Sequence, residues 1–190
     1  TPRVLEAGLL YALTGEKWAV DHVARQIAKL ERVYADPPHS FYREIKPFKG
    51  KPSAYFSCVH TALAVQLCRE ALDPVLVARF LALTHARLLE DRVNCPYVFT
   101  HFNAAHNAVV THAISTAITA LIFGAEAGHP MTDTLIEWGR DACEMHVRLG
   151  FDEQGVPFEG PMYALVTVEW VFFFADLLLR HGGENLFETL

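Results

Sequence analysis

Apolar residues recur at helical spacing along almost the whole of this 190-residue chain, and no other feature of the sequence limits its fold as strongly. Segments with apolar side chains at i, i+3, i+4 and i+7 cover residues 2–14, 16–35, 53–71, 73–91, 102–127, 132–149 and 160–182. The alternation that is typical of a strand does not compete with this pattern in any of them. The sequence therefore predicts an all-α fold.

The breaks between these segments are short and contain turn-forming residues. Asp73 and Pro74 suit the cap and first position of a helix, and Gly128 and Pro130 end another. Short breaks make neighbouring helices antiparallel. Because no repeat of fixed length is visible, we expect antiparallel helix hairpins that form part of an (α/α) toroid, as a single domain over residues 1–190.

Charge and hydropathy exclude two classes of partner. The net charge is −6, with 22 acidic and 16 basic residues, and the basic residues do not cluster as in a nucleic-acid-binding protein. The most apolar stretch, residues 165–179, is interrupted by Glu169 and Asp176. A transmembrane helix needs about 20 predominantly apolar residues, so we expect no membrane span. Because the basic residues are scattered, we also expect no nucleic-acid partner.

The cysteines and histidines do not form a recognisable metal motif. The four cysteines are widely scattered, which favours buried apolar thiols over a disulfide scaffold: Cys58, Cys68, Cys95 and Cys143. Glu126 and His129 have the spacing of a di-iron ligand pair, but Pro130 follows them directly and no second such pair completes a site. Cys143 and His146 supply two ligands where a structural zinc needs four. The sequence predicts no metal and no cofactor.

A first cluster of polar residues lies at the start of the apolar helix predicted at 102–127. Its members are Tyr97, His101, Asn103, His106 and Asn107. On a helix, Asn103 and Asn107 lie about 40° apart, and His106 lies about 60° from Asn103 and about 100° from Asn107, so the three form one polar wedge. A helix N-terminus favours anions. The alternative interpretation is that Asn103 caps the helix and His106 is a hydrogen-bonded core histidine.

A second cluster lies between the last two predicted helices. An acidic turn with Asp152 and Gly155 leads to Glu159 and Gly160, and Tyr163 follows one helical turn after Glu159. Glu159 and Tyr163 are candidate binding and catalytic residues. The alternative is that Glu159 is only an acid at a helix start and Tyr163 a half-buried aromatic residue.

These motifs together resemble those of heparinase II/III-type polysaccharide lyases and the related dermatan sulfate epimerase. The likeness consists of the Asp-Gly turn, the Glu-Gly pair and the Tyr, about 55 residues after a helix start that carries Asn and His. The upstream helix pair ALAVQLCREALDPVLVARFLALTHARLLEDRV is also similar, so the resemblance extends over residues 53–190. It implies a helical toroid, periplasmic or secreted location and, in longer relatives, a downstream β-sandwich domain.

The resemblance implies β-elimination at a uronic-acid residue of an anionic polysaccharide or oligosaccharide. His106 or Asn107 would face the substrate carboxylate and stabilise the developing enolate, and Tyr163 would exchange protons. Glu159 would order the site. Many family members have Asn-His at the helix start where this chain has His106-Asn107, so which side chain faces the substrate stays open.

Further substrate contacts are expected from both flanks of the site. Asn103, His101 and Tyr97 would contact the sugar, and the proline-rich segment 36–52 would add positive charge through Lys46 and Lys49 beside the cleft. Two other functions remain open: a uronyl C5-epimerase, and a non-catalytic helical repeat domain that binds a partner or a glycan.

Overall fold

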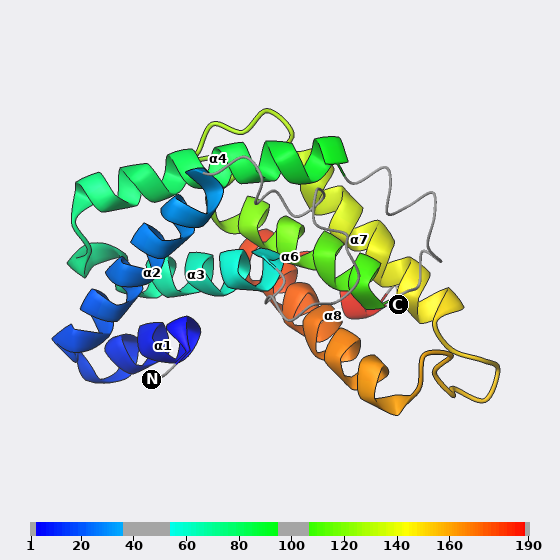
Figure 1. Ribbon diagram of the computed structural model, residues 1–190. Coiled ribbons are helices and arrows are strands. Elements are labelled where there is room, and N and C mark those ends of the chain that lie inside the picture. The colour runs from blue at the N-terminus through cyan, green and yellow to red at the C-terminus, as the bar shows by residue number, and fades with distance from the viewer. Residues whose placement is uncertain (1–2, 36–53, 95–106, 189–190) are drawn as a thin grey trace. The chain divides into compact units, whose positions relative to one another are not determined.

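The computed structural model describes residues 3–35, 54–94 and 107–188, and these residues are predominantly helical (Figure 1). The α-helices within these ranges are α1 (Val4–Thr14), α2 (Lys17–Ala35), α3 (Ala54–Cys68), α4 (Pro74–Asn94), α6 (Asn107–Phe123), α7 (Thr132–Leu149) and α8 (Pro161–Gly182). The same ranges contain no strand, and their one isolated β-bridge joins Phe151 and Pro157. The predicted all-α fold is confirmed.

Most helix boundaries lie within a few residues of their predicted positions, and the differences have local causes. The segment predicted at 53–71 ends as a 3₁₀ turn, Arg69–Ala71, before Asp73 accepts a hydrogen bond from the Val75 amide at 2.8 Å. Helix α6 ends at Phe123 rather than at 127 because turns follow, and Gly128 there has a φ of 65°. Left-handed backbone of this kind ends a helix.

The contacts between residues divide the chain into two compact units. The first unit contains Thr1–Glu90 and Ile122–Pro130, and the second contains Asp91–Leu121 and Met131–Leu190. The single domain, the hairpin arrangement and the toroid stay predictions.

In the first unit, α1 packs against both α2 and α3. The approach of α1 to α3 is close enough that a Cβ atom added to Gly8 would lie 2.8 Å from the Cα atom of Ala64. Two polar links join further segments of this unit: Arg79 of α4 pairs with Glu31 of α2, and Arg69 pairs with Glu126. Its core consists of Ala7, Ala19, Val23, Ile27, Leu30, Ala62, Ala64, Val65, Cys68, Leu72, Val77, Phe80 and Phe123.

A pair of histidines connects α4 to the turn that follows α6 in the first unit. His85 donates a hydrogen bond from Nδ1 to the carbonyl of Ala127 at 2.9 Å. The ring of His85 meets the ring of His129 edge to face, with 5.1 Å between the centroids. His129 is 5% exposed, and burial, followed by the charge of His85, lowers the pKa of His129 below 6.5.

We expect this pair to make the first unit less stable in acid. As the pH falls below 6.5, His129 takes up a proton in the unfolded chain before it does so in the folded chain, so the free energy of unfolding decreases. Replacing His129 with Gln should reduce this pH dependence, measured by urea unfolding at neutral and mildly acidic pH. His181→Gln, at the exposed end of α8, is the control. An equal pH dependence in His129→Gln and the wild type would contradict the expectation.

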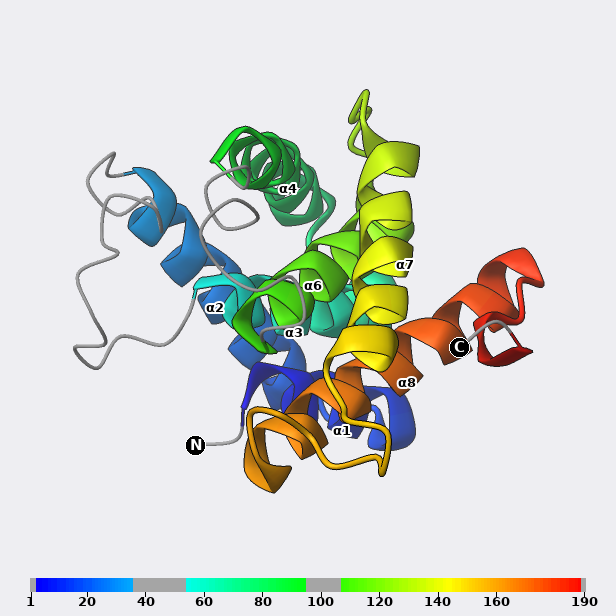
Figure 2. The ribbon, with the colours of Figure 1, turned by 90° about the vertical axis from the view of Figure 1, so that its right-hand side faces the viewer.

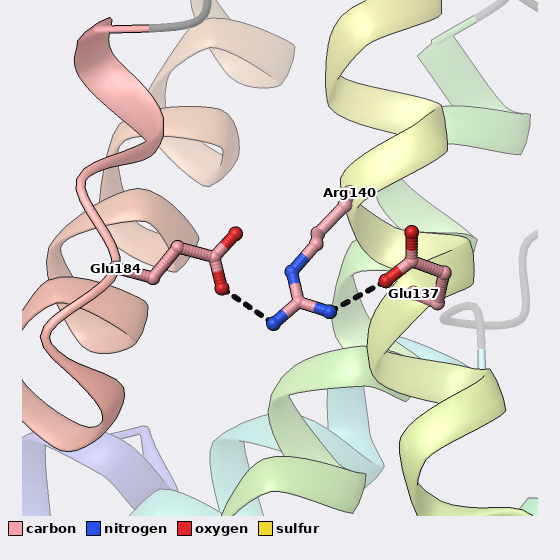
Figure 3. A network of polar contacts seen from close by, with 3 residues as sticks. All are labelled: Glu137, Arg140 and Glu184. Atoms are coloured by element: carbon pink, nitrogen blue, oxygen red, sulfur yellow. Dashed lines mark hydrogen bonds and ion pairs between the residues drawn. The ribbon is translucent and has the colours of Figure 1, made fainter.

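In the second unit, α7 is held closely between its neighbours. A Cβ atom added to Gly139 of α7 would lie 2.4 Å from the Cβ atom of Ala117 on α6 and 3.0 Å from Phe174 on α8. Arg140 of α7 donates hydrogen bonds to Glu137, at 2.6 Å, and to Glu184, at 2.5 Å (Figure 3). This network ties α7 to the segment that follows α8.

Helix α8, drawn in orange in Figure 2, is the one helix of 18 or more residues within the described part of the chain that is apolar enough to cross a membrane. It has 22 residues and a mean hydropathy of 1.8 over its most apolar 18 residues, so by length and composition alone it is able to cross a membrane. One face of it is packed within the second unit, through Val171, Phe174 and Leu178. The absence of a membrane span stays a prediction.

Two of the cysteines occupy core positions. Cys68 lies in the first unit and Cys143 in the second, and both are buried free thiols. Burial raises the pKa of Cys143 to about 12 and raises that of Cys68 as well. The interpretation of these two as buried apolar residues is confirmed; Cys95 and the side chain of Cys58 lie outside the described residues.

Candidate functional site

The site predicted from the sequence depends on the connection between α7 and α8, which folds as a tight turn. One carboxylate oxygen of Asp152 accepts hydrogen bonds from the amides of Gln154, at 3.0 Å, and Val156, at 2.8 Å. Gly155 supplies the left-handed conformation at its centre, with a φ of 77°. The chain then reverses, and Phe151 and Pro157 form the antiparallel bridge.

This turn holds Glu159 against the beginning of α6. The amide of Phe158 donates to the carbonyl of Gly150 at 3.0 Å, which closes the reversed segment. Gly160 follows with φ 85° and ψ 163°, a conformation that is essentially restricted to glycine. Oε2 of Glu159 then accepts a hydrogen bond from the backbone amide of Asn107, the first residue of α6, at 2.6 Å. The two predicted clusters therefore meet, although 52 residues separate these partners.

The position of Glu159 suits its charge. The first amides of a helix lack partners within the helix, and the helix dipole favours negative charge at that end. The alternative interpretation, an acid at a helix start, therefore describes Glu159 well, but the helix it serves is α6 rather than its own α8. Helix α8 begins at Pro161, and its N-cap residue, Gly160, provides no side-chain cap.

Tyr163 lies in the first turn of α8, four residues after Glu159. It is 55% exposed, so solvent and solutes have access to it. Its backbone carbonyl accepts a hydrogen bond from the hydroxyl of Thr167 at 3.0 Å, which is a contact within the helix. Asn107, in contrast, is half-buried.

Several predicted site residues lie outside the described residues. These are Tyr97, His101, Asn103 and His106, with Lys46 and Lys49 of the proline-rich segment. Their roles stay predictions, as does the position of that segment beside the cleft. Of the predicted site residues, Glu159 and Asn107 are in contact at the start of α6. Tyr163 lies four residues after Glu159, in the first turn of α8.

A ladder of hydroxyl groups along α6 was not predicted from the sequence. Thr111 donates to the carbonyl of Asn107, Ser115 to that of Thr111 and Thr119 to that of Ser115, at 2.6–2.8 Å. All three hydroxyl-bearing side chains are buried. The signal was present in the sequence as Ser and Thr at four-residue spacing within an apolar helix.

The buried histidines of the second unit have structural surroundings. His112 is 2% exposed, and its ring meets that of Trp138 edge to face, with 5.6 Å between the ring centroids. His146 is 4% exposed, and its ring meets that of Phe151 edge to face, with 5.5 Å between the ring centroids. Over the described ranges, no three His, Cys, Asp or Glu side chains are grouped so that they could hold a metal ion. Cys143 and His146 are both buried in the C-terminal half of α7.

The carboxylate of Glu159 determines how a second anion could be received here. It already accepts the hydrogen bond of the first α6 amide, so that donor is not available to a second anion. Of the polar side chains predicted at the start of α6, that of Asn107 lies within the described residues. Comparison of the chain with protein-family profiles, with curated proteins and with solved structures found no match.

Proposed function

We propose that this chain belongs to an enzyme that performs β-elimination at a uronic-acid residue of an anionic polysaccharide. The observation that supports the proposal most is the hydrogen bond between Glu159 and the Asn107 amide. It joins the two sequence motifs on which the resemblance to heparinase II/III-type lyases is based. We include in the proposal the toroidal arrangement of the helices and the contribution of a downstream β-sandwich domain.

In the proposed reaction, the phenol oxygen of Tyr163 acts as the base and removes the proton at C5 of the uronate. The electron pair forms a double bond between C4 and C5, and the C4–O bond breaks with the glycosidic oxygen as leaving group. The same phenol then returns a proton to that oxygen. Because a proton beside an ionised carboxylate is only weakly acidic, the charge that develops on the carboxylate must be stabilised by fixed donors.

The amide side chain of Asn107 and the imidazole of His106 are the proposed donors. Glu159 does not contact the substrate carboxylate in this scheme, because two carboxylates would repel each other. Its role is to hold the start of α6 in place through the Asn107 amide. The proposal therefore separates a positioning carboxylate, Glu159, from a proton-transferring phenol, Tyr163.

A polyanion also needs a local positive field, because the net charge of the chain is −6. We assign this role to Lys46 and Lys49. Attraction of this kind is screened by salt, so activity should be sought first at low ionic strength.

The test is incubation of the protein with alginate, heparan sulfate, chondroitin sulfate and hyaluronan, with dextran as a neutral control. A lyase generates the ultraviolet absorbance of an unsaturated uronate with at least one of the anionic polymers. The same incubation in D₂O, followed by NMR, detects exchange at C5 without a new double bond, which would assign the epimerase reaction instead. If neither signal develops with any uronate polymer, the proposal is wrong.

A further inference from the structure

The connection between α6 and α7 is anchored in the first unit by a titratable side chain. We call residues 124–130, which follow α6 and lead to α7, the α6–α7 turn. Four of its residues are exposed to solvent: Ala125, Glu126, Gly128 and Pro130. His129, in contrast, is only 5% exposed. A buried anchor is usually apolar, because a charged group is costly to bury, so the use of a histidine here makes the anchor sensitive to pH.

Side chains from two other segments of the first unit face this turn. His85 of α4 donates a hydrogen bond to the carbonyl of Ala127, and its ring lies against that of His129. Arg69, in the 3₁₀ turn after α3, engages both carboxylate oxygens of Glu126. The first unit therefore holds the turn, although α7 and most of α6 belong to the second unit.

A proton on His129 acts against one of these contacts and not against the others. Because Ala127 offers a carbonyl, Nδ1 of His85 carries a proton in the neutral as well as the charged ring, and that hydrogen bond persists. Glu126, the one carboxylate in the turn, is already engaged by Arg69. Burial first, and the charge of His85 second, lower the pKa of His129 below 6.5. Protonation therefore favours a turn in which His129 is exposed to water.

We propose that the α6–α7 turn is a pH-sensitive clasp: in mild acid His129 takes up a proton and leaves its buried position, and the turn opens while the cores of both units stay folded. The turn is able to open by itself because its backbone hydrogen bonds are local. The amide of Ala127 donates to the carbonyl of Phe123 at 2.8 Å, and the amide of His129 donates to that of Gly124 at 2.9 Å. The clasp involves neither Glu159 nor Tyr163, so it is independent of the proposed reaction.

Opening of the turn and unfolding of the whole chain respond to acid in the same direction, because both expose His129. At about pH 5.5, one unit below the ordinary pKa of 6.5, uptake of one proton favours either process by at most about tenfold over about pH 7.5. The two processes differ in the surface that they expose. A local opening exposes little surface, so amide exchange through it hardly changes with urea, whereas exchange through global unfolding rises steeply.

The experiment is amide hydrogen exchange of the whole chain by NMR, at about pH 7.5 and about pH 5.5, with and without urea below the unfolding transition. After correction for intrinsic exchange rates, we expect the protection of the amide at position 129 to fall by up to about tenfold in acid and to be nearly independent of urea. The amide of Val23, which is fully buried in the core of the first unit, should stay better protected by about tenfold or more and should respond steeply to urea.

Three variants identify the group responsible. His129→Gln should remove the dependence of this protection on pH, and His181→Gln, at the exposed end of α8, should keep it. His85→Gln retains a donor for the Ala127 carbonyl but not the charge, so it should make the dependence smaller. The proposal is wrong if the amide at position 129 has the protection and the urea dependence of the Val23 amide. It is also wrong if the pH dependence is lost in His181→Gln, or persists unchanged in His129→Gln or, should that variant not fold, in His85→Gln.

Discussion

Replacing Tyr163 with Phe should reduce the turnover of a uronate polymer by about 10²–10⁴-fold, the usual contribution of a general acid–base residue. The substitution removes only the phenol oxygen and keeps the ring. Since Tyr163 is 55% exposed, the helix and its packing should not change. The measurement is the initial rate of formation of the unsaturated product at saturating substrate, because a proton-transfer role affects turnover rather than binding.

The control for this experiment is Tyr11→Phe. Tyr11 belongs to α1 in the first unit and is partly buried, so this variant loses a phenol hydroxyl that has no role in the proposed chemistry. Its rate should equal that of the wild type, and both variants should unfold at the wild-type temperature. A Tyr163→Phe enzyme that is folded and fully active would remove Tyr163 from the mechanism.

The largest expected effect on stability comes from adding one methyl group at Gly139. The new Cβ atom would lie 2.4 Å from the Cβ atom of Ala117 and 3.0 Å from Phe174. Ala is favoured over Gly in a helix by about 1 kcal/mol, but overpacking a core costs about 1–3 kcal/mol and sometimes more. The steric cost should prevail because Ala117 has no rotamer with which to move away. We expect Gly139→Ala to lower the free energy of unfolding and Gly139→Val to lower it further.

Gly182→Ala is the matched control, because nothing lies within 4 Å of the position that its new methyl group would occupy. It lies at the end of α8, so the effect of helix propensity should be small and either neutral or favourable. Urea unfolding of the three variants and the wild type provides the comparison. If Gly139→Ala were as stable as Gly182→Ala, the close contact of α7 with α6 and α8 would be refuted.

The helices were predictable because their signals are local. The segment 132–149 was predicted with the boundaries that α7 has, since Pro130 precedes it and Gly150 follows it. The contact of Glu159 with the Asn107 amide was not predictable in this form, because helical periodicity carries no information about partners 52 residues apart. The sequence indicated that both residues were notable, and the turn formed by Asp152 and Gly155 brings them together.

The exposed face of α8 was also beyond the reach of sequence patterns. Its apolar residues surround much of the helix, so periodicity does not distinguish Phe174, which is fully buried, from Phe172, which is 55% exposed. Only the packing of the neighbouring helices makes that distinction. The same is true of Gly139: sequence patterns do not reveal that Ala117 on another helix lies too close to leave room for a side chain there.

The hydroxyl ladder of α6 has a consequence for how this protein can change over generations. Ser115 and Thr119 are buried, yet each hydroxyl donates its proton to a carbonyl of its own helix. The helices around α6 therefore do not have to provide acceptors for them. Mutations in those neighbours are free to alter size and shape without losing a hydrogen bond, so the partners of α6 can diverge while α6 itself stays the same.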